Sequence, residues 1–129
     1  MLRPKALDHV GLIVTDMDRS LSFYQLLGLV LLRRSGQGAG GASSAVLKVG
    51  NQEINVFCNP DFLPVPRGDP QGIDHFCLMM EAATIDEIVG ALHQAGIDIV
   101  KGPEKRRDGI AVFVSDPDGI RVELQIRAL

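Results

Sequence analysis

The sequence predicts an α+β fold made of two copies of one module, in which a strand is followed by a helix and three further strands. The segment at residues 7–14, LDHVGLIV, returns at residues 73–80 as IDHFCLMM, with a histidine at the third position of each. In each half, apolar residues at helical spacing come next, and strand-like segments follow them. This internal repetition indicates a doubled fold with equivalent strands.

The first half opens with a nearly continuous apolar run at residues 6–14, which is typical of a buried strand. Residues 15–18, Thr-Asp-Met-Asp, offer helix N-caps, and Gly28 is predicted to end the helix. One face of this helix carries Met17, Leu21, Tyr24 and Leu27. Residues 29–34 are predicted to form the second strand.

Residues 36–44 are rich in glycine and are predicted to form a mobile lid or a plain hairpin connection. Their glycines match the spacing GxGxxG, but a dinucleotide fingerprint must open a helix whose N-terminus holds the pyrophosphate. Residues 45–49 have a strand pattern instead, which argues against a nucleotide site. Gly50-Asn51 then predicts a tight turn into a returning strand at residues 52–57.

The second half repeats this order. The strand at residues 73–80 leads to a helix that begins at Thr84, where Thr84 and Glu87 predict a capping box, and that ends at Gly96. The apolar stripe of this helix consists of Ile85, Ile88, Val89 and Leu92.

After this helix we expect a strand at residues 97–100 and a charged loop at residues 102–108. Strands at residues 110–114 and 120–126 are predicted to pair across the Asp-Pro-Asp-Gly turn at residues 116–119. Each half therefore has the predicted order of strand, helix and three strands.

We expect a single domain, residues 1–129, made of modules at residues 6–58 and 73–127. A segment with four prolines and no periodicity, residues 59–72, is the predicted linker. A chain of 129 residues is long enough to bury a core without disulfides.

Composition places the chain among ordinary globular proteins. A net charge of −3 and a pI near 5.5 give no reason to expect nucleic acid or an anionic membrane as partner. No apolar run approaches the ~20 residues that span a bilayer, and no signal-type apolar core follows the N-terminus, so a cytoplasmic location is expected. Cys58 and Cys77 form no CxxC motif and lie in apolar runs, which predicts buried free thiols.

Alignment of the two halves pairs His9 with His75 and Asn55 with Glu123. Because side chains alternate along a strand, Asn55 and Glu53 share one face, and Glu123 lies on the equivalent face of the last strand. The apolar residues between them should face the helices. The sheets are therefore expected to carry polar groups on the face away from the helices.

We predict a metal site on this polar face, formed by His9, His75 and Glu123, with Asn55 as a weak fourth ligand. Two imidazoles and a carboxylate with open positions suit a divalent transition ion that must also bind water or substrate. The candidate ions are Fe, Mn, Ni, Co and Zn.

Three segments resemble the vicinal oxygen chelate superfamily: LDHVGL at residues 7–12, SFYQLLGL at residues 22–29 and DPDGIRVEL at residues 116–124. That group includes glyoxalase I, methylmalonyl-CoA epimerase, extradiol dioxygenases, fosfomycin-modifying thiol transferases and bleomycin-binding proteins. The resemblance implies two βαβββ modules forming a cup-shaped mixed sheet with the helices outside, usually in a homodimer. It also implies metal ligands on the first and last strands of each module.

Carried over residue by residue, the resemblance places His9, His75 and Glu123 on three ligand positions. Asn55 occupies the fourth, where glyoxalase I enzymes usually have glutamate and the epimerase has glutamine. Glu53 lies two residues along the strand, ~6–7 Å away, which is too far to serve the same ion. We therefore regard Glu53 as a reserve ligand or general base, and a displaced Glu123 as the other candidate base.

These features predict a metal-dependent lyase, isomerase or small dioxygenase that binds a small substrate through vicinal oxygens. The alternative is a metal-free protein that sequesters a ligand, as the bleomycin-binding members do. Those members lack the ligand set, and an aromatic content of 5% leaves few stacking surfaces for a planar drug.

Other polar residues have simpler interpretations. His93 is predicted to lie on the surface of the second helix. Asp8 and Asp74 precede the two histidines and should alternate to the other face, where hydrogen bonding to the site and plain solvation are both open. Solvent exposure is favoured over substrate binding for four arginines, Arg33, Arg34, Arg106 and Arg107.

Overall fold

The computed structural model describes residues 1–36, 41–59, 61 and 72–127. The chain divides into two compact units, Met1–Pro64 and Val65–Leu129, which we call the first and second modules. The boundary falls inside the predicted linker at residues 59–72. The union of the modules into one domain, and their closure into a cup, stay predictions.

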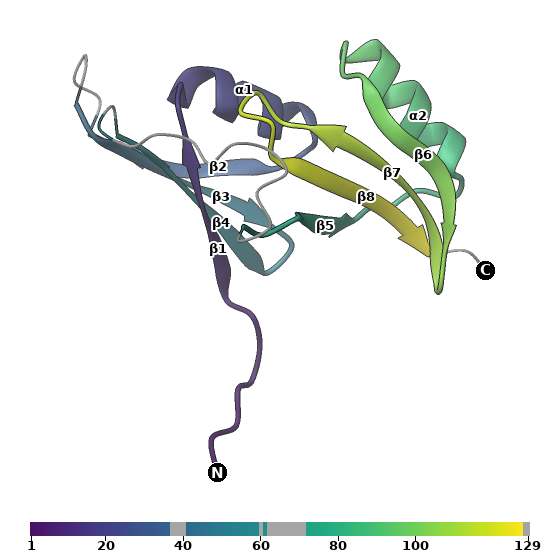
Figure 1. Cartoon of the computed structure of the whole chain (residues 1–129), viewed down its shortest axis with the longest axis horizontal. Helices are drawn as coiled ribbons and strands as arrows, with labels where there is room; N and C mark the ends of the chain where they lie inside the picture. The colour runs from purple at the N-terminus through teal and green to yellow at the C-terminus, as the bar shows by residue number, and fades with distance from the viewer. Residues whose placement is uncertain (37–40, 60, 62–71, 128–129) are drawn as a thin grey trace. The chain divides into compact units, whose positions relative to one another are not determined.

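The first module contains β1 (His9–Val14), α1 (Met17–Leu26), β2 (Val30–Ser35), β3 (Ser43–Val49) and β4 (Gln52–Cys58). Its strands lie in the order β1-β4-β3-β2 (Figure 1). β1 runs parallel to β4, whereas β3 is antiparallel to both β2 and β4. The predicted order of strand, helix and three strands is confirmed.

The second module contains β5 (His75–Met79), α2 (Ile85–Gln94), β6 (Ile99–Arg106), β7 (Gly109–Ser115) and β8 (Arg121–Arg127). Its strand order, β5-β8-β7-β6, repeats that of the first module. β5 is parallel to β8, and the other pairs are antiparallel. The α+β class with two βαβββ modules and mixed sheets is therefore confirmed.

The register within each sheet confirms the alignment of the two halves. In the first module His9 lies beside Glu53 and Gly11 beside Asn55. In the second, His75 lies beside Arg121 and Cys77 beside Glu123. Asn55 and Glu123 thus occupy equivalent positions, each two residues further along its strand than the residue that lies beside the histidine.

Each helix packs on one face of its own sheet, α1 against β2 and β4 and α2 against β6, β7 and β8 (Figure 1). The side chains on these faces are buried and apolar: Leu12, Val14, Leu47, Ile54 and Val56 in the first module and Leu78, Val112, Val114, Val122 and Leu124 in the second. The alternating residues on the opposite faces include the predicted ligands. Strand periodicity therefore separates the core from the polar face, as predicted.

Helix and strand ends agree only in part with the predictions. The Asp16 carboxylate caps α1 by accepting from the Arg19 backbone N–H at 3.1 Å. The predicted capping box of α2 is wrong, because Thr84 makes no side-chain capping bond and Glu87 accepts from the Ala83 backbone N–H at 3.4 Å instead.

The charged loop predicted at residues 102–108 is also wrong, because most of it belongs to β6. Gly102 and Pro103 suggested a loop, but β6 is an edge strand, where a proline is tolerated at an irregularity. The pairing with β7 shifts register between Lys101 and Glu104, and Gly102 has φ +89°.

Two further predictions concern the surface and the glycine-rich segment. His93 is exposed on α2, as predicted. β3 begins at Ser43, and residues 37–40 of the predicted lid lie outside the described residues. Among the described residues, no helix is long and apolar enough to cross a membrane.

The turn before β8 generates a stability prediction. Asp116 is 4% exposed, and its Oδ1 accepts from the backbone N–H groups of Asp118 and Ile120, both at 2.8 Å. Asp116→Ala leaves these donors unpaired, so the free energy of unfolding should fall by about 2–3 kcal/mol in urea denaturation. The matched Asp98→Ala variant, at an exposed position, should change it by less than about 0.5 kcal/mol. Equal losses in both variants would contradict the assigned role of the turn.

Candidate functional site

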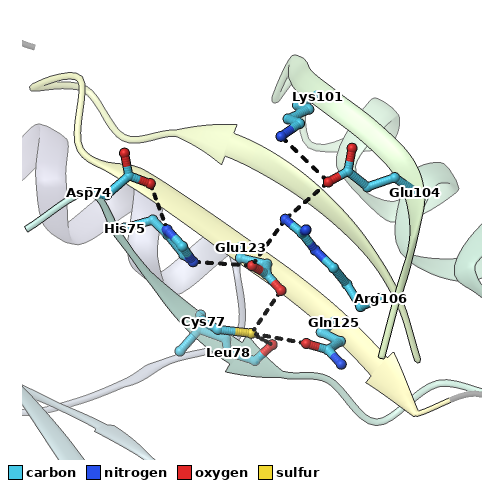
Figure 2. A network of polar contacts seen from close by, with 9 residues as sticks. All are labelled: Asp74, His75, Cys77, Leu78, Lys101, Glu104, Arg106, Glu123 and Gln125. Carbon is cyan, nitrogen blue, oxygen red and sulfur yellow. Dashed lines mark hydrogen bonds and ion pairs between the residues drawn. The ribbon is translucent and has the colours of Figure 1, made fainter. Parts of the chain in front are cut away.

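The parallel pairing of β5 with β8 brings two of the predicted ligands together. His75 and Glu123 project from the face of the sheet that does not contact α2, and His75 Nε2 lies 3.2 Å from Glu123 Oε1 (Figure 2). Glu123 is 5% exposed, whereas His75 is half-buried. An imidazole nitrogen and a carboxylate oxygen therefore face each other beside the core.

The charge of Glu123 is only partly compensated. Arg106 Nη2 lies 3.8 Å from Glu123 Oε1 but 3.0 Å from Glu104 Oε1. Lys101 Nζ approaches the same Glu104 oxygen at 3.5 Å (Figure 2). Because a buried carboxylate is costly unless it is paired, a further cation beside Glu123 would be favourable.

The Phe113 side chain lies on the same face of the sheet as Glu123 and contacts the site. It is 2% exposed and is the register partner of Glu123 on β8. The Arg106 guanidinium lies 5.0 Å and the Lys101 ammonium 5.3 Å from the centroid of its ring. The His75 ring meets it edge to face, with 5.6 Å between centroids. The apolar ring thus restricts the positions of three charged or titratable side chains.

Cys77 completes the surroundings of Glu123. Its Sγ lies 3.5 Å from Glu123 Oε2 and 3.7 Å from Gln125 Oε1, so the thiol can donate to either oxygen. The pKa of Cys77 is raised to about 11, first by burial of the thiol and then by the charge of Glu123 and the hydrogen bond to it. The charges of Arg106 and Arg127 oppose this shift. The sulfur is therefore a neutral thiol near neutral pH.

A hollow of about 390 Å³ adjoins this cluster. Its lining is polar and consists of His75, Arg106, Arg107, Asp108, Glu123 and Gln125. A small polar ligand could therefore reach the facing atoms of His75 and Glu123.

The first module presents a simpler polar face. His9 is exposed, and its Nδ1 lies 2.8 Å from Asp8 Oδ2. Glu53 lies beside His9 on β4, and Asn55 lies two residues further along the same strand. Asn55 Oδ1 is buried and has no hydrogen-bond partner. A buried acceptor without a donor is costly and could be satisfied by a cation.

The predicted ligand set is divided between the modules, with His75 and Glu123 in the second and His9 and Asn55 in the first. Within the part of the chain that the structure describes, no group of three His, Cys, Asp or Glu side chains is arranged to hold a metal ion. The donors nevertheless fit a divalent ion chemically, because His75, Glu123 and Asn55 supply the nitrogen and oxygen atoms that such ions prefer. Joint ligation by His9 with His75 and Glu123 stays a prediction.

Several expectations need correction. As residues, Cys77 is exposed and Cys58 half-buried, so the prediction of buried thiols is wrong, although both cysteines are free. The Cys77 sulfur itself is partly buried where it contacts Glu123, which is why burial still raises its pKa. Strand alternation could have placed Cys77 on the face of His75, two residues earlier. Asp74 was expected on the other face, with hydrogen bonding to the site and solvation both open. Its Oδ2 lies 2.8 Å from His75 Nδ1, so the first alternative is observed, and Asp74 precedes β5, which begins at His75.

Comparison with known sequences identifies the family. A profile of the Glyoxalase/Bleomycin resistance protein/Dioxygenase superfamily matches residues 6–124. The chain belongs to this superfamily. The match spans both modules, and the vicinal oxygen chelate resemblance drawn from the sequence motifs is confirmed.

Individual superfamily members are similar along most of their length. The chain is 31% identical over 126 residues to a probable lactoylglutathione lyase from Synechocystis, covering 90% of this chain and 91% of the relative. It is 29% identical to the glutathione transferase FosA of Serratia marcescens, covering 97% of this chain and 83% of that protein. A glyoxalase family protein from Enterococcus faecalis superposes with a TM-score of 0.77 at 25% identity, covering 94% and 97% of the two chains. The superfamily thus includes lyases and transferases.

The raised pKa of Cys77 predicts slow alkylation in metal-free protein. A thiol with a pKa of about 11 is about one part in a thousand thiolate at pH 8, so its reaction with iodoacetamide should accelerate about tenfold per pH unit up to that pKa. Glu123→Gln removes the neighbouring negative charge, lowers the Cys77 pKa and should increase the rate at pH 8. Peptide mass spectrometry distinguishes Cys77 from Cys58, which serves as the internal reference. A Cys77 rate independent of pH between 7 and 9 would contradict this.

Proposed function

We propose that this superfamily member is a metal-dependent enzyme of the glyoxalase or dioxygenase type, which binds a small substrate through two vicinal oxygens. The observation that carries the proposal is the approach of His75 Nε2 to Glu123 Oε1 at 3.2 Å on the polar face of the second module. The reaction would be that of a lyase, an isomerase or a small dioxygenase.

In this proposal His9, His75 and Glu123 hold one divalent ion, with Asn55 as a weak fourth ligand. The incomplete pairing of buried Glu123 and the unpartnered Asn55 Oδ1 both support a cation near these atoms. His9 repeats the sequence and strand position of His75 in the first module. The ion would be Fe, Mn, Ni, Co or Zn, bound by neutral imidazoles and a carboxylate.

A divalent ion held by these ligands would supply Lewis acidity toward the two oxygens of a substrate. Proton transfer then requires a carboxylate that is not committed to ligation. Glu53, beside His9 in register and half-buried, is the first candidate base. A Glu123 carboxylate released from ligation is the second. The Phe113 ring, buried and edge to face with the His75 ring, would limit the access of water to that imidazole.

The superfamily resemblance also supports a homodimer as the working assembly. Sedimentation analysis at micromolar concentration should then give a mass of about twice the 13.9 kDa chain. A single species at the chain mass would contradict this part of the proposal.

The ligand set predicts the outcome of elemental analysis on protein purified without chelators or a metal-binding tag. Wild type should hold about one ion of Fe, Mn, Ni, Co or Zn per chain. His75→Ala should lower the affinity by more than about a hundredfold. His93→Ala removes an exposed histidine on α2 and should retain wild-type metal.

The identity of the ion would direct the assay, zinc or nickel toward glutathione adducts and iron toward dioxygen uptake. A wild-type protein without metal, even after each ion is offered, would contradict the enzyme proposal. It would favour the alternative, a metal-free protein that sequesters a ligand, in which His75→Ala leaves ligand affinity intact.

The position of Asn55 yields a second prediction. Asn55→Glu places a carboxylate where the second module has Glu123, so metal affinity should rise by about tenfold or more with the added ligand charge. Asn55→Ala should lower affinity by less than about tenfold, because an amide oxygen is a weak ligand. Asn51→Glu, at the exposed β3–β4 turn, is the matched control for added charge. Equal affinities of the two glutamate variants in a chelator competition would exclude Asn55 from the ligand set.

A further inference from the structure

Both modules carry the same contact between an aspartate and the histidine that follows it. Asp8 Oδ2 lies 2.8 Å from His9 Nδ1. In the second module, Asp74 Oδ2 lies 2.8 Å from His75 Nδ1, as Figure 2 shows. The same ring nitrogen is engaged in each case. Two occurrences at equivalent positions of a repeat distinguish this contact from an incidental surface interaction.

The strand boundaries explain how the aspartates reach the rings. β1 begins at His9 and β5 at His75, so each aspartate precedes its strand. Its side chain therefore need not follow the alternation of side chains along the strand. The backbone carbonyl of Asp8 also accepts from the Glu53 N–H at 3.4 Å, which anchors this residue to β4. The carboxylate can therefore turn toward the ring without disturbing the strand.

Such a contact determines which ring nitrogen carries the proton. A neutral imidazole has one N–H and one lone pair, and the hydrogen bond made by one nitrogen sets the role of the other. A carboxylate at Nδ1 favours the Nδ1–H tautomer and leaves the lone pair on Nε2. In His75, Nε2 faces Glu123 at 3.2 Å, so without a cation the carboxylates of Asp74 and Glu123 compete for the ring proton. A cation between Nε2 and Glu123 needs the lone pair that the contact with Asp74 leaves on Nε2.

We propose that Asp8 and Asp74 are positioning residues that hold His9 and His75 in the Nδ1–H tautomer, with the Nε2 lone pair available for a cation. This inference rests on the proposed metal-dependent function and adds two residues to it. A carboxylate that orients a ligating imidazole in this way commonly strengthens metal binding. Loss of such a carboxylate typically weakens metal binding by about 10- to 100-fold. Because the side chains of Asp8 and Asp74 are 91% and 79% exposed, we expect an effect on metal affinity at the lower end of this range.

The direct test observes the tautomers in metal-free protein by long-range ¹H–¹⁵N correlation spectra, at a pH where the imidazoles are neutral. Wild type should show Nδ1–H at His9, and Glu123→Gln protein, which lacks the carboxylate that competes at Nε2, should show Nδ1–H at His75. Asp8→Ala should change the tautomer ratio of His9 by about fivefold toward Nε2–H, and Asp74→Ala in the Glu123→Gln background should do so at His75. Asp8→Asn and Asp74→Asn keep an acceptor oxygen and should retain most of the wild-type ratio. Unchanged ratios in the alanine variants would overturn the inference.

The second measurement is metal affinity by chelator competition on the full chain. Each alanine variant should bind metal about tenfold more weakly than wild type, with partial recovery in the asparagine variants. Asp98→Ala, which removes an exposed carboxylate next to the edge strand β6, should match wild type and controls for net charge. Alanine variants within twofold of Asp98→Ala would overturn the positioning role even if the tautomers change.

The two proposals fail in different ways. If wild type binds metal but the alanine variants keep its tautomers or affinity, the positioning role is wrong and the proposed function stands. If wild type binds no metal, the proposed function is wrong, and the role of the aspartates toward a cation falls with it.

Discussion

The parallel register between the first and last strands of each module is the constraint on which the site depends. β1 pairs with β4 and β5 with β8, so each pair joins the two ends of its module across a helix and two strands. Because side chains alternate, a slip of one residue in β8 would turn Glu123 toward α2 and expose Leu124 on the polar face. The same pleat that buries Val122 and Leu124 therefore fixes the carboxylate beside His75.

The Glu123 carboxylate is buried and is only partly paired with cationic side chains. Glu123 is almost fully buried, yet Arg106, whose Nη2 lies 3.8 Å from it, is closer to Glu104. The Cys77 thiol donates to the other oxygen, which stabilises the charge without neutralising it. Burial of a carboxylate costs free energy that such neighbours offset only in part when the pairing is not close. A bound cation would offset the cost of burying Glu123. The stability of the second module should therefore increase when the proposed metal binds.

The sequence was most informative where one physical rule acts alone. The period of two along strands sufficed to align Asn55 with Glu123, and Asp116 was placed in a turn by its Asp-Pro-Asp-Gly context. It was misleading where rules compete: Gly102 and Pro103 suggested a loop, but edge pairing with β7 accommodates both residues. The contact of Asp74 with His75 was one of two alternatives left open, because it depends on where β5 begins. Helix and strand ends are set by hydrogen bonds that periodicity does not reveal. The proposed sharing of one ion by His9 and His75 involves both modules, whereas the strand patterns of the sequence describe each module by itself.

The two modules have diverged at equivalent positions in a way that bears on the proposed chemistry. Each contributes one aspartate-linked histidine, but the second module adds Glu123 with the Cys77 thiol beside it, whereas the first adds Asn55 beside Gly11. Glycine has no side chain to donate to Asn55 Oδ1, which explains why this buried oxygen lacks a partner. In the proposed function, the second module would therefore offer an ion a carboxylate, whereas the first would offer only an amide oxygen, which is the weaker ligand. A ligand of this strength leaves more of the charge of the ion uncompensated than a second carboxylate would, which favours the binding of a substrate oxygen at the proposed site.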